Sequence, residues 1–402
     1  MRMRSCWALV VGLLALPLAA AENKPIVIGE ISSYSTVPAF TVPYRNGWQL
    51  AVEEINAAGG LLGGRKLEVI SRDDGGKPDD ATRHAQELIS SQKADLLAGT
   101  FLSNVGLAVS DIALRNKVLF VAAEPLTDAL VWDKGNRYTF RLRPSTYMQA
   151  AMLAEEAAKL PAKTWATVAP NYEYGQSAVA NFKELLKAKR PDVEFVAEQW
   201  PALGKLDAGA TIQALAAAKS EAIFNVTFGA DLTKFVREGN LRGLFEGRAV
   251  VSMLTGEPEY LDPLKGETPK GWIVTGYPWD QIKSGAHQKF VQAYEKRYGE
   301  TPRLGSVVGY TTFMAIAEAI KKAGSTDAEK LIGALRGLKF ETVFGPVTFR
   351  ALDQQSTLGA FVGRLDLKDG RGVMVDWRYA DGTDYMPPDA VVKKRRPPEA
   401  MK

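Results

Sequence analysis

Cysteine and histidine are almost absent from this chain of 402 residues. It has 1 cysteine, Cys6, and 2 histidines, His84 and His287. The chain beyond Cys6 has no cysteine. It therefore cannot form a disulfide, a thiolate nucleophile or a cysteine zinc site. The two histidines lie far apart in helical patterns, which favours solvated positions over a metal ligand or a general base. We therefore expect no metal site and no cofactor.

Catalytic and phosphate-binding motifs are also missing. The segment Gly175–Val179 reads GQSAV and lacks the last glycine of a G-x-S-x-G hydrolase turn. The glycines between positions 59 and 64 match neither G-x-G-x-x-G nor a P-loop, and they follow a helical pattern. The formal charge of +4 falls to +2 when Arg2 and Arg4 are removed, which does not suggest nucleic acid. We expect a protein that is not an enzyme.

Residues 1–21 have the pattern of a cleaved export signal. Arg2 and Arg4 precede the apolar run 10–18, and small residues in an A-x-A arrangement end at Ala21. The alternative is an N-terminal membrane anchor, but the apolar run is short for crossing a bilayer, and no later segment reaches about 20 apolar residues. We expect a periplasmic protein whose signal peptide is cleaved near Ala21.

Short apolar strands alternate with amphipathic helices through most of the remaining chain. The first series begins at Ile26, and the pattern starts again after Pro144 with a second series that ends near Thr275. Such alternation is typical of a parallel sheet with helices on both faces. The sequence therefore predicts an α/β fold made of two doubly wound lobes. After Tyr277 come further helices and strands, and then the basic tail Lys393–Arg396, for which we expect a solvated, poorly ordered terminus.

The stretch Asp95–Leu130 is the most informative part of the first series. An apolar strand ends at Gly99, and Ser103 and Asn104 stand where the next helix should begin. In a parallel sheet this position is the usual ligand crevice, and the first turn of a helix favours a carboxylate or another anion. The alternative is that Ser103 and Asn104 only cap the helix.

The chain resembles the type I periplasmic binding proteins, and within them the leucine/isoleucine/valine-binding family of ABC importers. The resemblance rests on the run Glu54–Gly60, which reads EINAAGG, on Asp73-Asp74, on the turn Asn171–Gly175 and on Gly309-Tyr310. It implies a hinge with three crossovers, near residues 142, 276 and 361. The first lobe would then comprise residues 22–142 and 277–360, and the second lobe residues 143–276 and 361–402.

The resemblance also implies a set of ligand contacts. Ser103 matches the serine that holds a ligand carboxylate, Phe40 matches an aromatic wall, and Tyr174 and Phe228 match aromatic positions of the second lobe. Ala123 lies in a segment that usually offers small residues and a hydroxyl, so Glu124 departs from the family pattern. Glu124 or Glu257 would hold a ligand ammonium. Glu257 is the candidate for the acidic residue of the family, and an exposed loop carboxylate is its alternative. The full expected set is Phe40, Phe101, Ser103, Asn104, Ala123, Glu124, Tyr174, Phe228 and Glu257.

These residues lead to one main expectation and two alternatives. The main expectation is a monomeric solute-binding protein that captures an apolar, branched-chain or aromatic amino acid by hinge closure and delivers it to an ABC permease in the inner membrane. The first alternative is the same role for an aromatic carboxylate or amide, which has no ammonium to pair. The second is a ligand-sensing module for a receptor or regulator.

Overall fold

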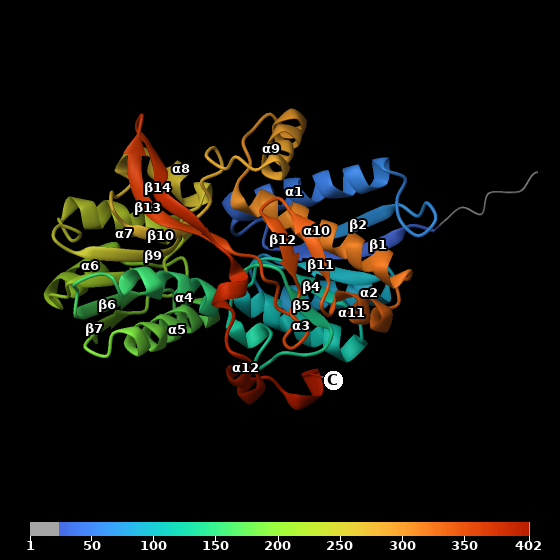
Figure 1. Ribbon diagram of the computed structural model, residues 1–402, viewed down its shortest axis with the longest axis horizontal. Helices are drawn as coiled ribbons and strands as arrows, with labels where there is room; N and C mark the ends of the chain where they lie inside the picture. The colour runs from blue at the N-terminus through green and yellow to red at the C-terminus, as the bar shows by residue number, and fades with distance from the viewer. Residues whose placement is uncertain (1–23, 402) are drawn as a thin grey trace, which may run out of the picture.

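A computed structural model describes residues 24–401, so the export signal expected at residues 1–21 lies outside the described residues. The chain forms two α/β lobes that lie side by side (Figure 1). The sheet of the first lobe has the order β2-β1-β3-β4-β5, and all of its strands are parallel. Its strands are β1 (Ile26–Ser32), β2 (Leu67–Asp73), β3 (Leu96–Gly99), β4 (Phe120–Ala122) and β5 (Thr139–Arg141).

Helices cover both faces of this sheet, and its central strand β3 is apolar throughout. Every residue of β3 is buried, as expected for a parallel strand that is covered on both sides. The helices of the lobe come from two separate parts of the chain, and the small hairpin belongs to the second of these parts. They are α1 (Pro38–Ala57), α2 (Pro78–Ser90), α3 (Ser103–Asn116), η1 (Asp128–Leu130), α9 (Gly285–Tyr298), α10 (Leu304–Ala323) and α11 (Ala328–Leu335), with β11 (Lys339–Thr342) and β12 (Gly345–Thr348).

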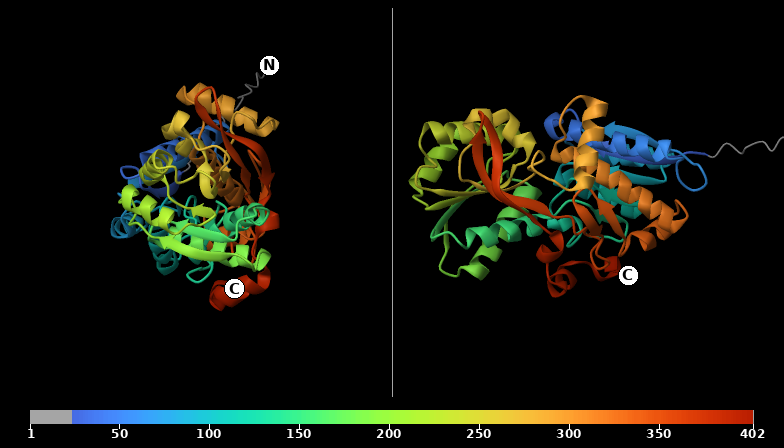
Figure 2. Two further views of the ribbon diagram at one scale, coloured as in Figure 1. Left: turned by 90° about the vertical axis from the view of Figure 1, so that its left-hand side faces the viewer. Right: turned by 45° about the horizontal axis from the view of Figure 1, so that its top comes forward.

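The second lobe is built on a sheet of seven strands in the order β14-β13-β10-β9-β8-β6-β7. Five strands are parallel, whereas β13 and β14 form an antiparallel hairpin added beside β10. Figure 2 shows this long hairpin on the outside of the lobe. The elements are α4 (Thr146–Ala157), β6 (Thr164–Val168), α5 (Glu173–Lys189), β7 (Glu194–Gln199), α6 (Ala208–Ala217), β8 (Ala222–Asn225), α7 (Gly229–Leu241), β9 (Ala249–Gly256), α8 (Pro258–Leu264), η2 (Lys265–Glu267), β10 (Ile273–Gly276), β13 (Ala360–Lys368) and β14 (Arg371–Ala380).

The segments that cross between the lobes lie beside one another. The first follows β5, the second joins β10 to α9, and the third joins β12 to β13. The first and third are hydrogen-bonded, because the Arg141 amide donates to the Gln354 carbonyl (3.1 Å) and the Ser356 amide donates to the Arg141 carbonyl (2.9 Å). The predicted fold class of two α/β lobes is confirmed.

The C-terminal tail adds a fourth crossing and differs from the poorly ordered terminus that we expected. After η3 (Gly382–Tyr385), the helix α12 (Asp389–Arg395) and η4 (Pro398–Met401) lie beneath the first lobe (Figures 1 and 2). Arg396 is only 2% exposed and donates hydrogen bonds to the carbonyls of Val131, Asn136 and Asp353. The expected second lobe included this tail, but the tail makes these contacts with segments expected in the first. The exact division of the chain between lobes remains a prediction.

None of the described helices is long and apolar enough to cross a membrane. The described part of the chain also contains no group of three or more acidic, histidine or cysteine residues that could hold a metal ion.

Helices α1 and α10 pack closely enough that their contact requires glycine. A Cβ atom at Gly47 would lie 2.0 Å from the Ser306 carbonyl oxygen, and one at Gly309 would lie 2.1 Å from the Tyr44 carbonyl oxygen. After Tyr277 the chain returns to the first lobe, where α10 packs on α1 through backbone contact. The start of α10, close to this contact, faces the second lobe.

Gly309→Ala should lower the free energy of unfolding by about 1–3 kcal/mol, because the added methyl group forces the two helices apart. The matched control is Gly333→Ala in α11, where a Cβ atom would meet nothing within 4 Å. That substitution should raise the free energy of unfolding by about 0.5–1 kcal/mol through helix propensity alone. Urea denaturation followed by circular dichroism measures both values. Equal effects of the two substitutions would contradict the close helix contact.

Candidate functional site

Six aromatic side chains meet where the two lobes face each other. Phe40 and Phe101 come from the first lobe, and the other four come from the second. The ring centroids of Phe40 lie 5.3 Å from Phe101, 5.2 Å from Tyr260 and 6.2 Å from Phe228. We call this set the aromatic cage; it consists of Phe40, Phe101, Tyr172, Tyr174, Phe228 and Tyr260.

The topology of the two sheets explains why these rings converge. Each cage residue follows the carboxyl end of a parallel strand, which is where ligands bind in open α/β sheets. Phe101 lies between β3 and α3, Tyr174 is in the first turn of α5 after β6, and Phe228 directly precedes α7 after β8. Phe40 lies in the first turn of α1, because this helix begins at Pro38.

The cage encloses a cavity of about 30 Å³ that also touches polar groups. This volume is close to the space that one water molecule occupies in the liquid, because rings from opposite lobes are already in contact. A molecule the size of an amino acid therefore fits only when the lobes move apart. The remaining lining residues are Ser103, Glu124, Leu126, Arg143 and Leu254.

Ser103 and Asn104 do not cap helix α3. The residue at the N-cap position is Leu102, and it makes no side-chain cap hydrogen bond. The Ser103 hydroxyl oxygen accepts a hydrogen bond from the Thr127 amide (3.2 Å), which leaves its proton available to a ligand in the cavity. Asn104 does not line the cavity, and its Oδ1 is buried without a hydrogen-bond partner among the described residues. The first amides of the helix lack intrahelical partners and lie next to Ser103.

A buried guanidinium joins two carboxylates beside the cage. Arg143 lies in the first crossing, 2.7 Å from Glu124 of the first lobe and 2.5 Å from Glu257 of the second. All three side chains are at most 7% exposed. Burial raises the pKa of Glu257 to about 8, against the opposing effect of Arg143. Burial lowers the pKa of Arg143, but Glu257 and Glu124 raise it more, so that the guanidinium stays charged.

One guanidinium therefore serves two carboxyl groups, of which one is protonated near neutral pH. Burial favours the protonated form of Glu257, whereas Arg143 forms an ion pair with Glu124 at 2.7 Å. Glu124 Oε2 bonds to Arg143, and Glu124 Oε1 makes no hydrogen bond with the described residues. The carboxylate thus retains an acceptor atom at the wall of the cavity.

Further polar contacts join the lobes around the cage. Asp128 of the first lobe accepts hydrogen bonds from Ser177 (2.9 Å) and Asn181 (2.5 Å) of α5. Glu259 of α8 accepts a hydrogen bond from the Gly305 amide (2.8 Å) at the start of α10. Burial raises the pKa of Glu259 to about 7. These contacts hold the lobes in the arrangement that brings the rings together.

A profile described as "periplasmic binding protein" matches residues 25–371, which is most of the chain. The chain belongs to the periplasmic binding protein family. This assignment agrees with the resemblance and with the two lobes, and it places the protein in a family of periplasmic solute-binding proteins rather than enzymes.

Relatives of this binding protein are known from sequence and from structure. A protein of Brucella suis named Leu/Ile/Val-binding protein homolog 7 is 26% identical, over 73% of this chain and 76% of its own. A solute-binding protein of an ABC transporter from Rhodopseudomonas palustris BisB5, in complex with 3,4-dihydroxybenzoic acid, has a TM-score of 0.78 and 25% identity, covering 89% of this chain and 98% of its own. An ABC-type branched-chain amino acid transporter protein from Rhodopseudomonas palustris CGA009 has a TM-score of 0.73 and 25% identity, covering 94% of this chain and 100% of its own.

The structure brings most of the expected residues of this binding protein together. Those that line the cage cavity are Phe40, Phe101, Ser103, Glu124, Tyr174 and Phe228, whereas Asn104, Ala123 and Glu257 do not line it. Glu257 is buried against Arg143, which differs from the alternative of an exposed loop carboxylate. Their role in ligand binding remains a prediction.

Five residues that line the cavity are not in the set expected from the sequence: Leu126, Arg143, Tyr172, Leu254 and Tyr260. Tyr172 could have been found from its place in the same turn as Tyr174. Arg143 could have been found from the charge balance of the cleft, since two buried glutamates expected there require a nearby cation. Nothing in the local sequence marks Leu254, whose backbone adopts a φ of +68° at the end of β9. Such a value is rare for a bulky side chain.

Arg143→Leu should lower the free energy of unfolding by about 3–5 kcal/mol, because it leaves the Glu124 carboxylate buried without a counter-charge and Glu257 without its hydrogen-bond donor. Adding Glu124→Gln and Glu257→Gln to this variant should restore most of the loss. Arg83, which forms an exposed ion pair with Asp80, provides the control: Arg83→Leu should cost at most about 1 kcal/mol. Urea denaturation measures all three. A triple variant no more stable than the single one would contradict the shared role of Arg143.

Proposed function

We propose that this chain is the solute-binding component of an ABC importer and that it captures an amino acid with an apolar or aromatic side chain in the aromatic cage. The observation that carries the proposal is the charge arrangement beside the rings. Ser103 and the start of α3 offer donors for a carboxylate, and Glu124 offers an acceptor for an ammonium. Relatives named as Leu/Ile/Val-binding and branched-chain amino acid transport proteins support this ligand class.

The balanced charge of the site suits a zwitterion. Arg143 and Glu124 cancel one another, and Glu257 carries a proton near neutral pH. A ligand with one positive and one negative group adds no net charge to this buried site, whereas a simple anion does. Because uncompensated charges are costly in a dry cleft, an amino acid binds with the smaller electrostatic penalty.

An aromatic carboxylate is the second candidate, and one contact favours it. The Tyr174 hydroxyl is buried in the cage without a hydrogen-bond partner among the described residues. A ring hydroxyl of a ligand would satisfy this group, whereas an aliphatic side chain would not. The relative bound to 3,4-dihydroxybenzoic acid supports this candidate.

Delivery to the transporter completes the proposed function. Residues 1–21 direct export, the mature monomer binds its ligand in the periplasm, and closure of the lobes presents the complex to a permease in the inner membrane. The family assignment supports the periplasmic setting, and the crossings between the lobes supply the hinge that such closure needs.

Paired ligands that differ only in the ammonium group test the amino-acid assignment. Phenylalanine and leucine should bind the mature protein at least tenfold more tightly than 3-phenylpropanoate and 4-methylpentanoate, because a charged hydrogen bond contributes about 1.5–3 kcal/mol. Isothermal titration calorimetry measures each affinity.

Glutamine variants locate the ammonium partner. Glu124→Gln should weaken the binding of the amino acids at least tenfold and should not weaken the binding of the deaminated acids, since it removes the negative charge that balances Arg143. Glu257→Gln is the matched control and should leave affinities unchanged, since Glu257 does not line the cavity and already carries a proton. Unchanged amino-acid affinity in both variants, or an unmodified protein that binds the deaminated acids more tightly than the amino acids, would contradict the amino-acid assignment and favour an aromatic carboxylate.

A further inference from the structure

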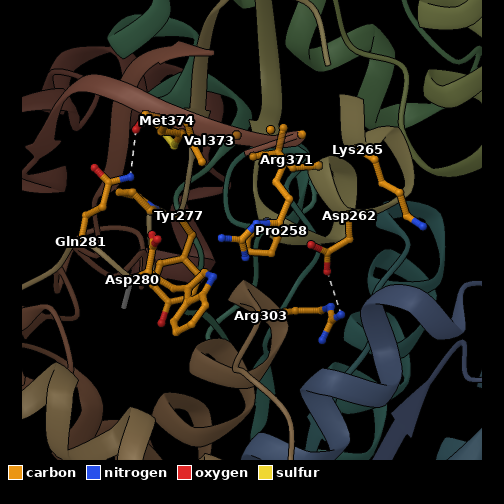
Figure 3. A pocket seen from close by; sticks show the side chains of 16 residues that line it. Pro258, Asp262, Lys265, Tyr277, Asp280, Gln281, Arg303, Arg371, Val373 and Met374 are labelled. Atoms are coloured by element: carbon orange, nitrogen blue, oxygen red, sulfur yellow. Dashed lines mark hydrogen bonds and ion pairs between the residues drawn. The ribbon is translucent and has the colours of Figure 1, made fainter. Parts of the chain in front are cut away.

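A second and larger cavity lies on the hinge side of the second lobe. Its volume is about 410 Å³, and it shares no lining residue with the cage cavity. Three segments enclose it: the helix α8, the residues 277–281 that leave β10 toward the first lobe, and the residues 370–374 that open β14. Arg303 of the first lobe completes the rim (Figure 3). We call this the hinge-side cavity.

The lining of the hinge-side cavity combines an apolar surface with cations. The apolar part is supplied by Pro258, Leu261, Tyr277, Trp279, Val373 and Met374. Arg371 reaches into the middle of the cavity, next to Pro258 (Figure 3). Neither the Arg371 guanidinium nor the Lys265 ammonium forms an ion pair with any described residue, and both residues are exposed.

We propose that the hinge-side cavity is a second ligand site for a small organic anion, whose negative group pairs with Arg371 and whose apolar body packs against Trp279 and Met374. The volume suits this assignment, because ligand cavities in proteins usually measure about 300–1,000 Å³. An arginine fork next to apolar surface is a typical arrangement for binding a carboxylate or phosphate.

The charges favour an anion over a cation. The Asp262 carboxylate is already paired with Arg303 at 2.7 Å, as the dashed line in Figure 3 shows. Asp280 is then the one lining carboxylate without an ion pair among the described residues, against the two cations Arg371 and Lys265. The unpaired groups thus leave an excess of one positive charge, which a monovalent anion neutralises.

The two cavities lie on opposite sides of one short segment. Leu254 and Tyr260 face the aromatic cage, whereas Gly256, Pro258 and Leu261 face the hinge-side cavity. The segment carries Leu254 in the left-handed backbone region, a conformation that costs free energy and persists only where the surroundings enforce it. An occupant of the hinge-side cavity therefore contacts the back of the wall that lines the cage.

Fluorine NMR of the mature protein labelled with 5-fluorotryptophan tests the site, with benzoate as the probe. Trp279→Phe identifies the signal of Trp279 by its loss. Benzoate should shift this signal in a saturable way, because the proposed site places its ring against Trp279. A Trp279 signal that does not move up to 50 mM benzoate, a concentration roughly fiftyfold above a millimolar dissociation constant, would overturn the proposal.

Two variants of the same hairpin separate binding at this site from effects of the cage. Arg371→Gln should weaken the benzoate titration of the Trp279 signal at least tenfold. Lys368→Gln removes a positive charge at the other side of the same turn, outside the cavity, and should leave the titration unchanged. If benzoate acted only at the cage, Arg371→Gln and the unmodified protein would titrate alike, and that result would overturn the proposal.

Discussion

The buried contact of Arg143 with two glutamates is the constraint on which the candidate site depends. Arg143 belongs to the first crossing, Glu124 follows β4 of the first lobe, and Glu257 directly precedes α8 of the second. The guanidinium therefore fixes one group from each lobe relative to the hinge. Glu124 is turned toward the cage, and α8 is positioned so that Tyr260 packs on Phe40. Removing a single charge from this cluster leaves the other charges buried without compensation.

The two parallel sheets position the other residues of the candidate site around that cluster. Side chains that follow the carboxyl ends of parallel strands meet between the lobes, which explains why residues as distant in sequence as Phe40 and Phe228 touch. The rings provide apolar surface, and the start of α3 with Ser103 provides donors. The interlobe contacts of Asp128 and Glu259 stabilise the closed arrangement. Because rings from the two lobes are in contact when closed, ligand entry depends on hinge opening.

The sequence was sufficient to predict the two-lobed fold, since strand and helix patterns are local properties of the chain. Ser103, selected at a strand end, and Phe228, selected through the resemblance, both line the cage cavity, and their role in binding stays a prediction. The sequence was not sufficient for the tail, where Arg396 is buried by backbone carbonyls that no local pattern reveals. Arg143 and Leu254 were missed for a related reason: their roles depend on partners more than 15 residues away, or on a backbone conformation that tertiary contacts impose.

A crystal structure of the mature protein with saturating phenylalanine tests the central claim most directly. The account predicts that the ligand lies inside the aromatic cage, with its carboxylate at Ser103 and the first turn of α3 and its ammonium at Glu124. Arg143 should remain bound to both glutamates. A ligand bound outside the cage, or Arg143 detached from Glu124 to hold the ligand carboxylate itself, would contradict the account.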